Sequence, residues 1–80
     1  MTVKRSLSIR GHRTSITLEE AFWRRLNNLA EEQAMSIAEL VAEIDETRNA
    51  TVNLSSALRV HILEEALGRL EKDVGEAPRP

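Results

Sequence analysis

Residues 14–44 read TSITLEEAFWRRLNNLAEEQAMSIAELVAEI and indicate a strand, a helix and the start of a second helix. Apolar and polar residues alternate from Arg13 to Leu18, which is the two-residue period of a strand with one buried face. The apolar residues that follow recur at helical spacing: Leu18, Phe22, Leu26, Leu29 and Ala30. Because Thr17 and Glu20 have the spacing of a capping box, we predict that the first helix begins at or just after Thr17.

A second helix is predicted to open at Ser36, because Ser36 and Glu39 form another capping-box pair. Its apolar stripe consists of Ile37, Leu40, Val41 and Ile44. Residues 48–53, RNATVN, contain two asparagines and two β-branched residues and indicate a loop.

A third helix is predicted over residues 54–73, with Asn53 or Ser55 as its N-cap. Its apolar residues cover more than a narrow stripe, which indicates burial on several sides, including contact with another chain. Of the two adjacent aromatic residues in the first helix, Phe22 is predicted to be core and Trp23 to pack at a subunit contact.

The segment before the strand also alternates, but with the opposite parity. Leu7 and Ile9 occupy odd positions, whereas Ile16 and Leu18 occupy even ones. One regular strand cannot make this switch, because a shift of one residue turns every side chain to the other face. We therefore predict a bulge or a tight turn at Gly11-His12.

Size and composition favour an oligomer. Eighty residues make one domain, and a monomer of this size buries only about 60% of its unfolded surface. The chain has no cysteine, which removes disulfides and thiolate metal sites. We expect no cofactor and no metal site. Neither an apolar stretch of membrane-spanning length nor a signal-peptide pattern is present, so a cytoplasmic location is expected.

The charge is distributed unevenly along the chain. Residues 1–18 carry four basic residues and no acid, a net charge of +4. Residues 19–80 carry seven basic and thirteen acidic residues, a net charge of −6. A basic N-terminal segment on an acidic body fits a nucleic-acid binder better than the overall charge of −2 suggests.

One strand of about six residues cannot stand alone, and the simplest solution pairs it with its copy from a second chain. The inward face would then carry Thr14, Ile16 and Leu18, and the outward face would show Arg13, Ser15 and Thr17 twice. A two-stranded ribbon fits the major groove of DNA, where arginine suits guanine and short hydroxyls bond several bases.

The segment AEEQAMSIAELV, residues 30–41, carries most of a resemblance to the ribbon-helix-helix superfamily, which includes the Arc and MetJ repressors and here spans about residues 12–47. GHRTSITLEEAFWRRL and NLSSALRVHILE further resemble a subgroup of short bacterial members. The resemblance implies a mainly α fold with one short strand. It also implies an intertwined homodimer with an intermolecular antiparallel ribbon, here with an additional C-terminal helix.

The resemblance assigns residues to roles. It implies that Arg13, Ser15 and Thr17 contact the bases. We expect phosphate contacts from Lys4, Arg5, Arg10, His12, Ser36 and Ile37; the last two lie at a helix N-terminus, where free N–H groups favour anions. The turn between the two helices carries Gln33-Ala34-Met35 where the family usually has glycine.

The expected organisation is a basic arm or extra strand (1–11), a ribbon-helix-helix core (12–47), a loop and third helix (48–74) and a disordered tail (75–80). The leading hypothesis is a sequence-specific transcription regulator, a repressor, that binds double-stranded DNA in the nucleoid as a dimer or tetramer. The alternatives are an antitoxin whose third helix binds a toxin, and a helical interaction module that does not bind DNA.

An enzyme is disfavoured. Ser55, His61 and Asp45 could be imagined as a catalytic triad, but no glycine-rich elbow or oxyanion loop accompanies them.

Overall fold

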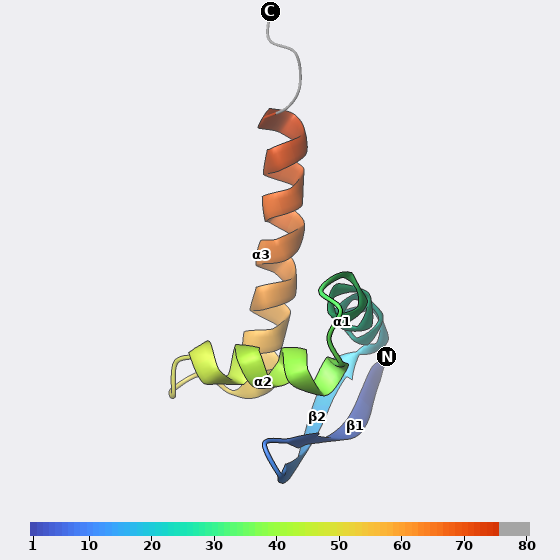
Figure 1. The fold of residues 1–80 in the computed structure, drawn as a ribbon, viewed down its shortest axis with the longest axis vertical. Helices are drawn as coiled ribbons and strands as arrows, with labels where there is room; N and C mark the ends of the chain where they lie inside the picture. The colour runs from blue at the N-terminus through green and yellow to red at the C-terminus, as the bar shows by residue number, and fades with distance from the viewer. Residues whose placement is uncertain (76–80) are drawn as a thin grey trace, which may run out of the picture.

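The chain folds into a β-hairpin covered on one face by three helices (Figure 1). The structure, a computed structural model, describes residues 1–75. Its elements are β1 (Thr2–Ile9), β2 (His12–Glu19), α1 (Glu20–Glu32), α2 (Ile37–Thr47) and α3 (Leu54–Gly75). Beyond Gly75, the tail predicted for residues 75–80 falls outside the described part. The far half of α3 projects away from the other elements (Figure 1).

The two strands pair with each other in antiparallel order, with Ser6 opposite Ser15. The chain therefore has two strands rather than the one short strand expected, and pairing with a copy from a second chain stays a prediction. The break at Gly11 is a two-residue turn in which Arg10 (φ 51°) and Gly11 (φ 79°) are both left-handed, as a type I′ hairpin requires. Across such a turn, an odd-numbered residue of β1 pairs with an even-numbered residue of β2. The change from odd to even apolar positions in the sequence therefore marks a hairpin.

α1 begins later than predicted, and the proposed capping box at its start does not form. β2 continues through Glu19, which is the N-cap of α1 and makes no side-chain capping bond. Thr17 lies inside the strand opposite Lys4, so its backbone belongs to the ladder and not to a helix start. The first N–H of α1, that of Glu20, donates to the carbonyl of Met1 at 3.1 Å.

The turn from α1 to α2 is a Schellman motif built on alanine. The N–H of Met35 donates to the carbonyl of Ala30, and the N–H of Ala34 to that of Glu31, both at 3.0 Å. Ala34 has φ 55°, the left-handed conformation that glycine adopts without steric cost. The sequence Gln33-Ala34-Met35 therefore forms the usual turn with a strained residue at its centre.

The caps predicted for the other two helices are confirmed. At the start of α2, the Glu39 N–H donates to the Ser36 hydroxyl at 3.1 Å, and the Ser36 N–H donates to the Glu39 carboxylate at 3.0 Å. At the start of α3, the Asn53 side chain accepts a hydrogen bond from the Ser56 N–H at 2.8 Å.

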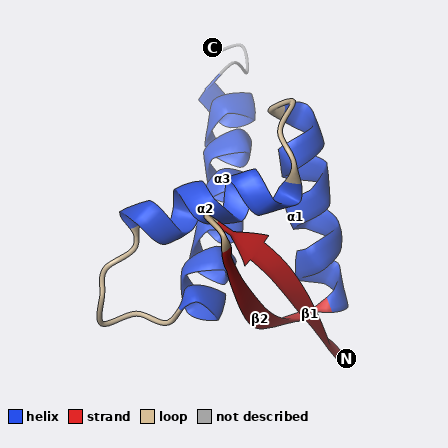
Figure 2. Cartoon of the chain, turned by 60° about the horizontal axis from the view of Figure 1, so that its bottom comes forward, coloured by secondary structure: helices blue, strands red, loops and turns tan. Residues whose placement is uncertain are grey.

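One core lies between the inner face of the hairpin and the helices (Figure 2). Its buried members are Ile9, Ile16, Leu18, Trp23, Leu26, Leu29, Ala30, Leu40, Val41, Ile44, Leu58 and Ile62. Trp23 is 1% exposed, which corrects its predicted place at a subunit contact, while Phe22 is only partly buried. Burial does not leave the indole N–H unsatisfied, because it donates to the carbonyl of Val3 at 2.8 Å.

Candidate nucleic-acid interface

The outer face of the hairpin is a continuous polar surface. Side chains directly opposite each other in an antiparallel pair share a face, so the register decides which residues lie together. Besides Thr2, which is exposed opposite the partly buried Glu19 at the end of the sheet, six exposed residues share this face: Lys4, Ser6 and Ser8 from β1, and Arg13, Ser15 and Thr17 from β2. The hydroxyls of Ser6 and Ser15 lie 3.3 Å apart at its centre. We call this set of six residues the outer hairpin face.

Two cations stand at opposite ends of the outer hairpin face. Lys4 is paired with Thr17 and Arg13 with Ser8, which places them four rows apart, or about 13 Å along the strands. The hydroxyl groups lie between them. The nearest carboxylate of β2, that of Glu19, receives a hydrogen bond from Arg59 at 2.8 Å, which holds its pKa below the ordinary value of 4.5. The face is therefore positively charged.

Two other cations of the N-terminal segment contact the protein's own helices or core. Arg5 lies on the inner side of β1, where its guanidinium sits 5.3 Å from the centre of the Trp23 ring. Arg10, in the turn, forms an ion pair with Glu46 at 3.0 Å and donates to the carbonyl of Ala42 at 3.1 Å. These contacts join the middle of β1 to α1 and the hairpin turn to α2.

The remaining residues expected to bind phosphate lie away from the outer hairpin face. His12 pairs with Ile9 on the inner face, although its side chain is exposed. Ser36 and Ile37 lie at the start of α2, which packs on the inner side of the hairpin (Figure 2). There the Ser36 N–H and hydroxyl bond Glu39 and lower the pKa of its carboxyl group. This N-terminus thus already has an ionised partner.

A ribbon-helix-helix domain model matches residues 2–66 of this chain. The chain belongs to the ribbon-helix-helix family. The match covers the hairpin, α1, α2 and the first half of α3. Ribbon-helix-helix domains commonly bind DNA and are typically not enzymes. No curated protein and no solved structure matches the chain.

In this ribbon-helix-helix chain, the structure brings together the three residues expected to contact bases, Arg13, Ser15 and Thr17. Sequence reasoning overlooked the hydroxyls of Ser6 and Ser8 on the same face. The alternation of Leu7 and Ile9 with the serines could have placed Ser6 and Ser8 on the outer face, because Leu7 and Ile9 point inward. That inference required recognising that the change of parity at Gly11 marks an intrachain hairpin.

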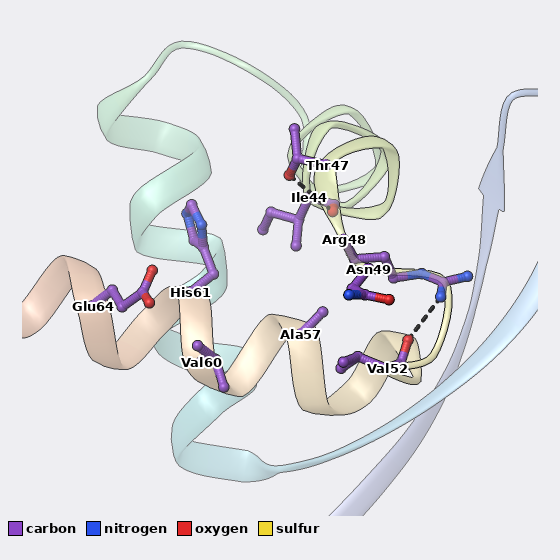
Figure 3. Close-up of a pocket in the computed structure, with 9 residues that line it drawn as sticks. All are labelled: Ile44, Thr47, Arg48, Asn49, Val52, Ala57, Val60, His61 and Glu64. Carbon is purple, nitrogen blue, oxygen red and sulfur yellow. Dashed lines mark hydrogen bonds between the residues drawn. The ribbon is translucent and has the colours of Figure 1, made fainter.

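A hollow between the end of α2, the loop at residues 48–53 and α3 is lined by apolar side chains and by polar ones that include Thr47, Arg48 and His61 (Figure 3). Asp45, the acid of the imagined triad, is bound by Arg48 at 2.6 Å, and Arg48 also donates to the carbonyl of Val52.

The buried Nε2 of His61 lacks a hydrogen-bond partner, and the nearest carboxylate oxygen of Glu65 lies 3.9 Å away. Among residues 1–71, whose side chains the structure describes, no three His, Asp or Glu side chains gather as metal ligands. Within residues 1–75, no helix is long and apolar enough to cross a membrane.

Proposed function

We propose that this protein is a sequence-specific DNA-binding transcription regulator, acting as a repressor, that reads the major groove with the outer hairpin face. The observation that carries the proposal is the composition of that face. Arg13 supplies a long donor suited to guanine, four hydroxyls beside it can bond several bases, and Lys4 adds a second cation. Arginine and hydroxyl side chains in these positions combine base recognition with attraction to phosphate.

Each copy would insert its own two-stranded ribbon. If two copies paired through the remaining edge of β2, the resulting sheet of four strands would be about 14 Å wide between its outer strands. The major groove is only about 12 Å wide and admits a ribbon of two strands. The intrachain hairpin has that width, so a homodimer would read two half-sites, one with each hairpin.

The distribution of charge over the rest of the surface supports an orientation in which the outer hairpin face meets DNA. Within residues 1–75, the acidic residues belong to the helices and to the end of β2, and repulsion between them and phosphate would turn the helices away from DNA. Arg10 and Arg5 would contribute less to affinity than their charge suggests, because Glu46 and Trp23 already engage them. The working surface is therefore the outer hairpin face rather than the whole N-terminal segment.

Selection from random duplexes, followed by mobility-shift titration, tests the proposal. Arg13→Ala should weaken binding to the selected site by about 1–3 kcal/mol per half-site and relax the preference at one base pair. The control is Arg24→Ala, which removes the same charge from the exposed surface of α1. Equal losses in the two variants, or no selected sequence with the unsubstituted protein, would contradict base reading by the hairpin.

A further inference from the structure

α3 carries an exposed apolar stripe that the domain itself does not cover. Val60, Leu63, Leu67 and Leu70 are 51%, 55%, 47% and 60% exposed. They are spaced three, four and three residues apart, which is the alternation of the a and d positions of a heptad repeat. Contiguous apolar surface of this kind marks an interaction site on a water-soluble domain.

The stripe points away from the domain that holds α3. The other side of the helix is anchored by Leu58 and Ile62, which are buried in the core, and by Arg69, which pairs with Glu32 of α1. Beside the stripe, the half-buried Phe22 lines an apolar groove together with Val60, Ile62, Leu63 and Ala66. A partner on the stripe would therefore also cover Phe22.

We propose that α3 pairs in parallel with α3 of a second copy, forming a short two-stranded coiled coil. A heptad stripe complements its own copy, because each a or d side chain packs among the side chains of the same seam on its partner. Valine at the a position of residue 60 and leucine at both d positions are the combination that favours two parallel strands.

The flanking charges select the parallel orientation. With Val60 at a, Arg59 occupies a g position, and Glu64 and Glu71 occupy e positions. In a parallel pair, each g position faces the e position five residues further along the partner. Arg59, which binds Glu19 of its own chain, would therefore also lie opposite the partner's Glu64, twice by symmetry. In an antiparallel pair, e positions face each other and Glu64 would oppose glutamates of the partner. Among residues 59–71, the parallel arrangement is therefore the one free of like-charge pairs.

The parallel arrangement also suits the proposed function, on which this step rests. The hairpin lies at one end of the chain and α3 extends toward the other (Figure 1). Parallel helices place both hairpins at the same end of the dimer, where one duplex can contact both. Antiparallel helices would place them at opposite ends of a pair about 33 Å long, because α3 has 22 residues.

Sedimentation of three forms of the full chain tests the pairing. The unsubstituted protein should be a dimer, and Leu67→Lys, which places two ammonium groups in the seam, should weaken dimerisation at least about 100-fold. Gly68→Lys adds the same charge one residue along the helix, where an added side chain meets no atom within 4 Å, and should leave the dimer intact. A monomeric unsubstituted protein, or a dimer that survives Leu67→Lys, would overturn the proposal.

Cysteine cross-linking tests the orientation. The chain has no cysteine, so Leu70→Cys introduces a unique thiol at a d position, where parallel partners face each other. Mild oxidation should convert Leu70→Cys to a covalent dimer. If a disulfide forms only when Leu70→Cys is mixed with Val60→Cys, the helices are antiparallel and the proposal fails. DNA binding is measured separately, so a monomer that still selects a sequence would refute the coiled coil and leave the proposed function standing.

Discussion

Trp23→Phe tests how the N-terminal strand is held. The indole is 1% exposed, donates to the carbonyl of Val3 and lies beneath the guanidinium of Arg5, so it joins α1 to β1. Removing the N–H leaves that carbonyl without its indole donor, at a net cost of about 1 kcal/mol. Aromatic side chains bury roughly 150–250 Å², and losing about 50 Å² of that costs a further 1–1.5 kcal/mol. The expected total is about 2–3 kcal/mol, a large share of the stability of a small domain.

Urea denaturation followed by circular dichroism, at one fixed chain concentration, measures this loss. Amide exchange provides a second readout, because the β1–β2 ladder around Val3 should exchange faster relative to α2 than in the unsubstituted protein. A change in unfolding free energy below about 0.5 kcal/mol, or faster exchange confined to α1, would refute the assigned role of Trp23.

Three further predictions concern the hairpin register, the helix turn and a cap. Ile16→Asp should abolish folding, because it buries an unpaired carboxylate, while Ser15→Ala should leave the melting curve unchanged; equal melts would show that the register is wrong. Ala34→Gly should raise the unfolding free energy by up to about 1 kcal/mol by relieving the left-handed strain, whereas Ala42→Gly, inside α2, should lower it by about 0.5–1 kcal/mol. Hydrogen bonds from Ser36 lower the folded-state pKa of Glu39, so its contribution is present above the ordinary pKa of 4.5 and is lost as the pH falls through the folded value. In Glu39→Gln that loss should disappear, and identical pH profiles from 6 to 3 would exclude this contribution.

Local chemistry predicted much of the fold from the sequence. The helices α2 and α3 and their caps at Ser36 and Asn53 follow from short-range hydrogen bonding and from apolar periodicity. The start of α1 was misplaced, because Thr17 and Glu20 satisfy the spacing rule for a capping box while the pairing of β2 with β1 holds Thr17 extended. A tertiary contact overrode a local preference at that point.

The β2 half of the candidate site was predicted from the sequence, and the β1 half was not. The alternation of β2 places Arg13, Ser15 and Thr17 on one face without any knowledge of a partner strand. Which strand lies beside β2 depends on the turn at Gly11, and the sequence left a bulge and a tight turn both open. Assigning Ser6 and Ser8 of β1 to the candidate site therefore required the strand register that the structure shows.

Photocrosslinking from single cysteines most directly tests the claim that the outer hairpin face meets DNA. The chain contains no cysteine, so Ser6→Cys, Ser15→Cys and Glu43→Cys each carry one photoactivatable label, and Glu43, exposed on α2, is the control. Labels at positions 6 and 15 should both cross-link to the selected duplex, and the label at 43 should not. Cross-linking from position 43 with none from the two hairpin positions would contradict the account.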